Sequence, residues 1–433
     1  MWNMETIGIK PDDPKEKDDI VLEMFKNTVT KENKRYSVSW PWRNEDQNLL
    51  PENYELSLGR LKSSMKRLEK DPDLLRRYDE IIKTQVEKGI IEKVDASEVN
   101  NNNRKHYIPH HVVIKPDNAT TKLRIVYDAS AKTKKGNKSL NECLYRGPVI
   151  LQDLCGLLLR FRTKKIGIIA DIEKAFLQIG IHESDRDITR FLWLKDVNKP
   201  VTNNNLETYR FARLPFGVIS SPFLLGATVE HHLEEIESPI ADQIKDDIYV
   251  DNIITGCDNE DEGIELYQQG KSIFKEASMN LREWLTNSPE VNNKIKPEDQ
   301  VEDKVTKVLG IVWNAQSDEL SINTKKVEAT EPATTKREVL STIASIYDPL
   351  GMVTPAVINM KIFLQDLWEK EIDWDDPLDE DDKEKWKNIT KDLKELSNIQ
   401  LPRFVGNKNN KNNCWDFVTR QRKRMQQPFT FVR

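Results

Sequence analysis

The residues of this chain that are best suited to chemistry are acids that follow apolar runs. Asp251 lies in the tetrapeptide Tyr-Val-Asp-Asn at positions 249–252, between the apolar runs 248–250 and 253–255. Asp and Asn tolerate the backbone conformations of a tight strand connection, so the pattern predicts a hairpin with a carboxylate at its tip. A hairpin between two buried strands is a rigid mounting for a metal ligand.

A second acid, Asp171, follows the apolar run 166–170. The small and branched residues of that run predict a strand that ends at Asp171. Two strand-end acids from distant segments meet the requirement of a two-metal phosphoryl-transfer site, where magnesium ions about 3.5–4 Å apart need oxygen ligands at a fixed separation. A single acid after a strand is most often a turn or cap residue, so the pair needs further support.

That support comes from the order of other segments along the chain. They are 124–130 (RIVYDAS) before Asp171, 214–222 (LPFGVISSP) between the two acids, and 309–311 (LGI) after them. In this order they resemble the fingers, palm and primer-grip motifs of reverse transcriptases. The longer segments 138–148 (KSLNECLYRGP), 191–194 (FLWL), 280–284 (NLREW) and 346–351 (IYDPLG) resemble the polyprotein of Bel/Pao long-terminal-repeat retrotransposons. The resemblance extends from about Trp2 to about Arg403.

The resemblance implies that Asp171 and Asp251 are catalytic and bind two divalent ions, Mg²⁺ or Mn²⁺. At the following position the family usually has a second Asp, whereas this chain has Asn252. An amide oxygen can ligate a metal ion but brings no charge, so Asn252 is expected to be a weak ligand that lowers the metal affinity. Retained activity and loss of activity are both compatible with this departure.

The resemblance also implies a binding site for the incoming nucleotide. Phe176 matches the aromatic residue that excludes a 2′-hydroxyl, although without the motif it would read equally well as a core residue of its turn. Arg124 matches the arginine that binds the nucleotide phosphates, with Lys115 as a helper. An arginine suits this role because its planar guanidinium can donate two hydrogen bonds to one phosphate. Gly217 would let the backbone approach the nucleotide, and Phe216 would contact its sugar.

Leu309 and Gly310 resemble the primer grip. Taken alone, these two residues would be an ordinary strand start.

The composition describes a soluble globular chain with a polar surface. It has 433 residues, of which 37% are hydrophobic and 32% are charged, enough for two or three compact units. No apolar run reaches the length of a membrane span, and the first residues lack the pattern of a signal peptide. The four cysteines are scattered, which fits a reducing compartment and excludes a zinc ribbon. His106, His110 and His111 lie close together without a cysteine, which favours a strand over a metal site.

The net charge of −6 is unfavourable for a protein that binds nucleic acid through its phosphates. The charge is unevenly distributed, since much of the negative charge lies in residues 371–382. Residues 60–77 and 160–165 are rich in Lys and Arg. These runs are compatible with a local basic cleft and equally with solvated helix faces.

The pattern of segments, with the resemblance, predicts an α+β right-hand polymerase with fingers, palm and thumb, in which helices back an antiparallel palm sheet. We expect a connector arm at 1–55, N-terminal helices and fingers at 56–148, and the palm with both acids at 149–300. Primer-grip strands and a helical thumb or connection are expected at 301–403, and a disordered tail at 404–433. The expected helices lie within 56–93 with a new start at 71–73, and at 221–236, 335–346 and 355–368. The expected strands lie at 107–114, 122–127, 305–313 and 319–322.

Two related activities are not expected in this chain. A retroviral aspartic protease needs an Asp-Ser/Thr-Gly tripeptide, which does not occur here. Parts of the family are catalogued as a Pao peptidase region, a label that would not reflect catalytic residues of this chain. A ribonuclease H domain would follow the thumb, and the chain ends before one is expected to fit.

The resemblance therefore implies an RNA-directed DNA polymerase, a nucleotidyltransferase of the DNA/RNA polymerase superfamily. Its expected partners are an RNA template, a DNA primer and deoxynucleoside triphosphates, with no membrane partner, and its expected location is the cytoplasm, within retrotransposon particles. The alternative is a catalytically impaired or inert nucleic-acid-binding remnant of a polyprotein. Asn252 and the missing protease and ribonuclease H motifs favour that alternative, and a primer-extension assay separates the two.

Overall fold

The computed structural model describes residues 15–43, 49–95, 104–114, 123–322, 333–391, 396 and 399–406. The chain forms two compact units that each combine several segments. The first unit comprises residues 1–151, 172–241 and 272–280, and the second comprises 152–171, 242–271 and 281–433. The expected contiguous palm at 149–300 is thus divided between the two units, because residues 172–241 and 272–280 pack with the N-terminal segments.

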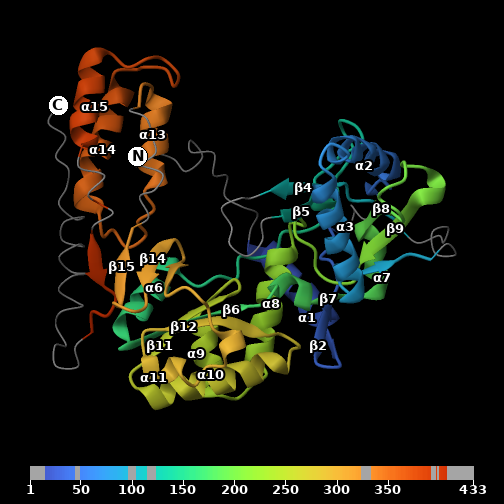
Figure 1. Ribbon diagram of the computed structural model, residues 1–433, viewed down its shortest axis with the longest axis horizontal. Coiled ribbons are helices and arrows are strands. Elements are labelled where there is room, and N and C mark those ends of the chain that lie inside the picture. Colours follow the sequence, from blue (N-terminus) through green and yellow to red (C-terminus); the bar gives the residue numbers. More distant parts are fainter. Residues whose placement is uncertain are drawn as a thin grey trace. The chain divides into compact units, whose positions relative to one another are not determined.

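The first unit contains short sheets surrounded by helices (Figure 1). Its helices are α1 Lys15–Thr28, α2 Tyr54–Leu68, α3 Pro72–Glu87, α5 Leu140–Cys143, α7 Glu183–Arg186 and α8 Ser221–Glu234, with 3-10 turns η3 Ala175–Gln178, η4 Asp187–Thr189 and η5 Asn203–Asn205. Its strands are β1 Thr30–Glu32, β2 Arg35–Val38, β3 Ile91–Lys93, β4 His110–Ile114, β5 Leu123–Tyr127, β7 Gly180–Ile181, β8 Arg190–Leu194 and β9 Leu206–Phe211. They form the sheets β1-β2-β7 and β3-β9-β8 and the hairpin β4-β5.

The helices α2 and α3 follow from local sequence signals. Pro72 begins α3, and the Asp71 side chain accepts a hydrogen bond of 3.0 Å from the Leu74 backbone N–H. An acid before a proline satisfies a free N–H at a helix start, which explains the break between the two helices. The structure therefore confirms the expected new helix start at 71–73.

The N-terminal segment differs from the expected connector arm. Residues 35–38 form β2, which pairs in parallel with β7, so that Ser37 lies opposite Gly180. Tyr36 and Trp40 are each only 2% exposed, and the Phe25 ring of α1 packs on Phe223 of α8. The prediction failed because prolines and charges report only local preference, whereas this segment is folded by pairing with distant residues.

The second unit contains two sheets and two groups of helices. Its helices are α6 Leu154–Thr163, α11 Pro289–Asn292, α13 Lys336–Ser345, α14 Thr354–Glu369 and α15 Glu380–Thr390, with most of α9 Pro239–Asp247 and α10 Glu260–Lys275 and the 3-10 turn η6 Pro297–Asp299. Its strands are most of β6 Ile166–Ile172, then β10 Ile248–Tyr249, β11 Asn252–Cys257, β12 Leu281–Thr286, β13 Val305–Val308, β14 Ile311–Asn314, β15 Glu319–Ser321 and β16 Gln400–Pro402.

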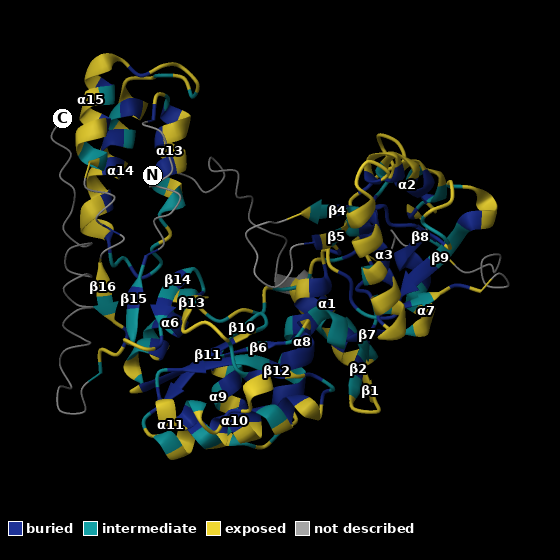
Figure 2. Ribbon diagram, in the orientation of Figure 1, coloured by how far each residue is buried: buried dark blue, intermediate teal, exposed yellow. Residues whose placement is uncertain are grey.

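The palm sheet of this unit has the strand order β10-β11-β6-β12. Its central strands are buried, and the more exposed helices α10 and α11 cover the sheet (Figure 2). Phe161 of α6, Ile254 of β11 and Trp313 of β14 share one hydrophobic cluster, so α6 and the second sheet cover the sheet as well. Burial from both sides explains why β6 and β11 are continuous apolar runs.

The second sheet has the order β13-β14-β15-β16. The run 305–313 was expected to be one strand, but it is broken by a turn at Leu309 and Gly310, so that Val308 lies opposite Ile311. The fourth strand, β16, comes from far along the chain and pairs with β15.

The helices α13, α14 and α15 form a module around their own apolar core. The Phe363 ring of α14 stacks on Trp386 of α15 with ring centres 5.4 Å apart. The Thr335 side chain accepts a hydrogen bond from the Glu338 backbone N–H, and Glu338 bonds back to Thr335 in a capping box. Such reciprocal bonds fix a helix start, and α13 and α14 lie within one residue of the expected bounds.

Candidate active site

The hairpin β10–β11 carries Asp251 at its tip, as the sequence predicted. Tyr249 pairs with Asn252, so the connection is a turn of two residues, Val250 and Asp251. Val250 has a φ of 60°, while Asp251 is not among the residues with positive φ, which is the pattern of a type II′ turn. A β-branched residue rarely adopts positive φ, so the turn holds Asp251 at a cost of about 1–3 kcal/mol of strain.

Asp171 lies directly beside this turn. In the antiparallel pairing of β6 with β11, Asp171 is opposite Asn252. Opposite residues of an antiparallel pair point to the same face of the sheet, so the side chains of Asp171 and Asn252 share a face. Asp171 and Asp251 are half-buried and Asn252 is exposed. The structure thus brings these three sequence-predicted residues together at one end of the palm sheet.

Asn252 also holds the Asp251 carboxylate. Its Nδ2 donates a hydrogen bond of 2.8 Å to Asp251 Oδ1. Burial raises the pKa of Asp251 above its usual range, and the hydrogen bonds from its own backbone N–H and from Asn252 oppose the shift. A second carboxylate at position 252 would replace this hydrogen bond by repulsion between like charges.

Two carboxylates and an amide are a donor set of hard oxygens, which suits magnesium or manganese rather than zinc. Among the described residues, no group of three or more His, Cys, Asp and Glu side chains could hold a metal ion. Asp171, Asp251 and Asn252 nevertheless fit a magnesium site in which substrate phosphates supply further ligands, because magnesium is commonly bound through only one or two carboxylates.

A polar network beneath the hairpin was not anticipated from the sequence. Asp247 is only 8% exposed, and its carboxylate accepts hydrogen bonds from Arg160 Nε at 2.9 Å and Thr255 Oγ1 at 2.7 Å. Gln243 Nε2 donates to the same Thr255 hydroxyl at 2.7 Å. The network joins α6 and α9 to β11, the strand that follows the turn. Its only sequence signal was Thr255, a polar residue within an apolar run.

Arg403 fastens the other end of the strand that leads to Asp171. It is fully buried, and its guanidinium donates to both Asp318 carboxylate oxygens at 2.6 and 2.9 Å. It also donates to the carbonyl oxygens of Phe161, Lys164 and Lys165 at 2.5, 2.9 and 2.8 Å. These bonds tie β16 to the start of β6.

Gly167 of β6 makes room for this guanidinium. A Cβ on Gly167 would lie 2.8 Å from Arg403 Nε, closer than real contacts allow. Sequence reasoning had treated Gly167 only as part of an apolar run, and it had no signal for Arg403.

The predicted nucleotide-contacting aromatic residues lie together in the first unit. The Phe176 ring on η3 is 4.8 Å from the Phe216 ring, with 53° between the ring planes. Phe216 is 53% exposed, and Phe176 is half-buried. Phe176 thus packs on a ring that is largely exposed, which favours a contact surface over the core reading of Phe176.

Gly217 occupies a position that only glycine fits. Its φ is 94°, and a Cβ would lie 2.3 Å from the Tyr127 carbonyl oxygen. Asn141 fixes the loop, since its Nδ2 donates to the Gly217 carbonyl oxygen at 3.1 Å and its Oδ1 accepts from the Ile219 backbone N–H at 2.9 Å. Asn141 lies in the segment 138–148 and had no role assigned from the sequence.

Arg124 is exposed on β5, opposite Val113 of β4. Lys115, the expected helper, lies outside the described residues.

The expected primer-grip residues form the turn between β13 and β14. Leu309 and Gly310 have φ values of 46° and 94°, so both have the positive φ of a type I′ turn. A Cβ on Gly310 would lie 2.5 Å from the Tyr347 ring. Burial, followed by the neighbouring Tyr249, raises the pKa of Tyr347.

The rings of His106 and His110 are buried and have hydrogen-bond partners within the protein. His106 and His110 are buried, and burial lowers the pKa of each to about 4. The His110 ring bonds to the Tyr78 hydroxyl and to the Leu192 carbonyl oxygen. Neutral rings with protein partners agree with the preference for a strand over a metal site.

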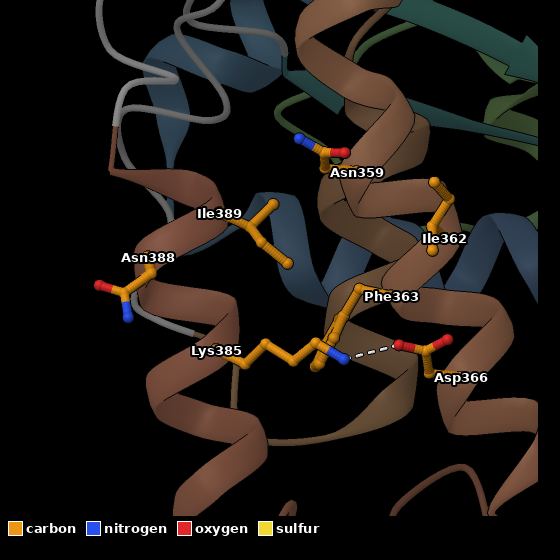
Figure 3. Close-up of a pocket in the computed structure, with 7 residues that line it drawn as sticks. All are labelled: Asn359, Ile362, Phe363, Asp366, Lys385, Asn388 and Ile389. Carbon is orange, nitrogen blue, oxygen red and sulfur yellow. Dashed lines mark hydrogen bonds and ion pairs between the residues drawn. The ribbon is translucent and has the colours of Figure 1, made fainter.

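An open groove of about 460 Å³ lies between α14 and α15 (Figure 3). Its Lys385 is paired with Asp366 at 2.6 Å and lies over the Phe363 ring. The remaining lining residues are Asn359, Ile362, Asn388 and Ile389. The groove holds one internally neutralised ion pair and no convergent set of catalytic groups.

Two family models match this sequence. Residues 114–284 match the reverse transcriptase (RNA-dependent DNA polymerase) model, which includes Arg124, Asp171, Phe176, Gly217 and Asp251. Residues 335–417 match a model described as a Pao retrotransposon-like RNaseH-like domain. No curated protein matches the chain.

The second match has a different label from the expected one. Its description names an RNaseH-like domain, whereas the sequence was expected to carry a segment catalogued as a peptidase. Its described residues form α13 and α14, which match the helices expected at 335–346 and 355–368, and also α15 and β16, which were not expected. The expected tail falls outside the described residues from position 407 onward.

Solved structures of a foamy viral protease-reverse transcriptase resemble the chain. The "dRH" form in complex with double-stranded DNA has a TM-score of 0.51 at 15% identity, covering 90% of this chain and 63% of that chain. The complexes with double-stranded DNA and with an RNA/DNA hybrid have TM-scores of 0.48 and 0.47, at 16% and 14% identity, over 73% and 88% of this chain.

This chain spans 56% and 42% of the length of those last two structures. The likeness to the "dRH" form confirms the α+β polymerase fold. None of the described helices has the length and apolar character needed to cross a membrane.

Proposed function

We propose, on the premise that this chain is the reverse transcriptase region of a Bel/Pao-type retrotransposon, that it is an RNA-directed DNA polymerase. A reverse transcriptase domain implies a need for divalent metal ions in general. The observation that carries the proposal is the pairing of β6 with β11, in which Asp171 lies opposite Asn252 beside Asp251. The proposed substrates are an RNA template, a DNA primer and deoxynucleoside triphosphates.

Asp171 and Asp251 are the proposed ligands of two Mg²⁺ or Mn²⁺ ions, with Asn252 as a weak third ligand. When bound, such ions lower the pKa of an attacking hydroxyl and neutralise the charge of a leaving pyrophosphate. The protein's own contribution is to hold the carboxylates ready. The strained turn fixes the Asp251 backbone, and the Asn252 amide fixes its carboxylate at 2.8 Å.

Residues of the first unit are proposed to bind the incoming nucleotide. Arg124 donates from its guanidinium to the phosphates, and Gly217 exposes its backbone where a side chain would clash. Phe216 contacts the sugar, and Phe176 fills the volume of a 2′-hydroxyl. In the second unit, the turn of Leu309 and Gly310 supports the primer end.

The sugar selection attributed to Phe176 is tested by replacing it with Val. Removing the ring empties the volume that a 2′-hydroxyl would enter, so ribonucleotides should be used far more readily while deoxynucleotide use falls little. The measurement is the ratio of kcat/KM for a deoxynucleotide to that for its ribonucleotide. An unchanged ratio with a general loss of activity would return Phe176 to a packing role.

The test of the whole proposal is extension of a DNA primer on an RNA template with Mg²⁺ or Mn²⁺. Wild-type protein should extend the primer, and Asp171→Asn and Asp251→Asn should not, although both variants should bind the template and primer normally. Extension that persists in both variants would refute the assignment of the acids.

The second candidate is an inert nucleic-acid-binding protein, favoured by the uncharged Asn252 beside Asp251. Its signature would be tight binding of an RNA/DNA hybrid by the wild-type protein without any extension under Mg²⁺ or Mn²⁺.

A further inference from the structure

Helix α2 has one buried face and one face that no other part of the described chain covers. Its buried residues are Ser57, Leu58, Leu61, Met65 and Leu68. These positions recur at helical spacing and lie on one side, so the residues between them point away from the first unit.

The outward face carries five cations, which we call the α2 cation face. They are Arg60, Lys62, Lys66 and Arg67 of the helix and Lys70 just after it, and all five are exposed. Among the described residues, no ion pair involves any of them. Two acids, Glu55 and Glu69, lie on the same segment, so its balance is positive in a chain whose net charge is −6.

The neighbouring helix α3 shows what a solvated charged face looks like in this protein. Its Arg76 is within 3.4 Å of Asp73 and 3.7 Å of Glu80, and its Lys83 is 2.6 Å from Asp79. Two of its three cations, Arg76 and Lys83, are therefore paired within the helix itself, whereas Arg77 is not. On the α2 cation face, by contrast, none of the five cations has an ion pair among the described residues.

In the second basic run of the sequence, three of the four cationic side chains also have protein partners within the described ranges, and that of Lys165 is the exception. Arg160 pairs with Asp247 at 2.9 Å, and Lys164 pairs with Asp258 at 3.0 Å. Arg162 donates to the carbonyl oxygens of Pro402 and Arg403. Among the described residues of the two basic runs, the α2 cations are the largest group without an ion pair.

The spacing of the α2 cations fits an extended anion. Lys62 and Lys66 are four residues apart on the helix, which separates them by about 6 Å along its axis, and Lys70 extends this row in the turn directly after the helix. Gly59 and Ser63 lie between the row and the two arginines, so the centre of the face has only small side chains. A single phosphate would engage one or two of these cations, whereas a strand with a phosphate at each nucleotide engages the row.

We propose that the α2 cation face binds the phosphate backbone of the single-stranded RNA template. The inference rests on the proposed polymerase function, which supplies RNA as the occupant. It also rests on the charge complementarity between a polyanion and a row of cations that have no ion pair within the described part of the chain. Contacts to phosphates position a strand without reading its sequence, so the face serves any template.

The test compares two variants with the same change in charge. Lys66→Gln with Lys70→Gln removes two cations from the α2 face, and Arg76→Gln with Lys83→Gln removes two paired cations from α3. Each protein is titrated with a fluorescein-labelled RNA/DNA hybrid that has a single-stranded RNA overhang, and with the same hybrid without the overhang. Titrations are made in EDTA over a range of KCl concentrations, and melting temperatures confirm that the exposed substitutions leave the fold intact.

The α2 variant should bind the overhang hybrid about tenfold more weakly at about 50 mM KCl, with a salt slope reduced by about 1.4 from the loss of two phosphate contacts. The α3 variant should bind like the wild type, and the hybrid without the overhang should not distinguish the proteins. Equal losses in both variants, equal losses on both hybrids, or unchanged binding would each overturn the proposal. So would tighter competition by polyglutamate than by single-stranded RNA, which would indicate an acidic protein partner.

EDTA removes the divalent ions, so the titrations measure binding without catalysis. Their outcome is therefore independent of polymerase activity. A wild-type protein that binds no hybrid would contradict the proposed function itself. A wild-type protein that binds, together with an α2 variant that binds equally well, would contradict only the role of α2.

Discussion

Two hairpins of the second unit use the same backbone device for different purposes. The turn of β10–β11 consists of Val250 and Asp251, and the turn of β13–β14 consists of Leu309 and Gly310. Each places a bulky apolar residue at positive φ, 60° for Val250 and 46° for Leu309.

The difference lies in the second residue of each turn. In β13–β14 it is a glycine, and the room that the missing side chain leaves is filled by the Tyr347 ring. In β10–β11 it is Asp251, half-buried and held by Asn252. The β13–β14 turn is thus stabilised by packing. The β10–β11 turn instead keeps a desolvated carboxylate, which packing alone would disfavour. A half-buried carboxylate such as that of Asp251 lowers the stability of the fold. Its fixed position in a strained turn therefore indicates a functional role.

The largest expected effect is a difference in catalysis between variants of the two turns. Asp251→Asn should reduce primer extension by about 10³-fold or more, because metal coordination contributes several kcal/mol to phosphoryl transfer. Leu309→Ala, in the other turn, should reduce it by no more than about tenfold and mainly through KM for the primer. Similar losses in the two variants, measured by steady-state kinetics, would erase the contrast between the turns.

The next effect separates them by stability. Gly310→Ala should lower the free energy of unfolding by about 1–3 kcal/mol, since the new Cβ must adopt a strained φ and meets the Tyr347 ring. Gly136→Ala is the matched control, because Gly136 has a φ of 101° and no atom within 4 Å of its added Cβ. Chemical denaturation should show a larger loss for Gly310→Ala, and equal losses would mean that the ring contact contributes nothing.

A smaller effect concerns the departure from the family pattern. Asn252→Asp should lower the Mg²⁺ concentration for half-maximal extension by about tenfold, because it adds a charged oxygen ligand beside Asp171 and Asp251. Without metal, the same variant should be less stable, since the 2.8 Å hydrogen bond to Asp251 becomes a repulsion. A magnesium titration of extension checks the first part. A higher requirement for Mg²⁺ would show that the hairpin is adapted to the amide.

The smallest effect is a pH dependence of stability in metal-free protein. The pKa of Asp251 is raised by burial, so the folded chain holds this proton to a higher pH than the unfolded chain does. The group therefore favours folding below its unfolded pKa of about 4 and disfavours it as the pH rises through the folded value. Asp251→Asn should be more stable than wild type at pH 7 and equal to it at about pH 3, by thermal melting in EDTA. A variant that is less stable at pH 7 would contradict this sign.

The sequence predicted those parts of the molecule that depend on local signals. The hairpin at Asp251 was recognisable from its turn residues, and α3 was recognisable from Asp71 and Pro72. The strand that ends at Asp171 was recognisable from its run of branched residues. These signals act within a few residues, so neighbouring positions along the chain suffice to read them.

Features that depend on distant partners were missed. The break at Leu309 and Gly310 was invisible because the ring that fills the glycine position, Tyr347, lies far along the chain. The run 160–165 was interpreted as a possible basic surface, yet two of its cations, Arg160 and Lys164, are paired with Asp247 and Asp258. Whether a Lys or Arg side chain forms an ion pair depends on acids that are distant in the sequence, so it can be determined only from the folded structure.

The bonds of Arg403 have a consequence for where a protease can cut this chain without loss of its fold. A cut anywhere between α15 and Arg403 would detach the only guanidinium that the described chain offers to the buried side of Asp318, and would leave carbonyl oxygens at the base of β6 without their donor. Breaking a buried pair by removing one partner costs about 3–5 kcal/mol, a large share of the stability of a typical domain. A stable polymerase fragment should therefore retain residues through at least Arg403, and limited proteolysis followed by mass spectrometry should find its resistant C-terminal boundary beyond that arginine.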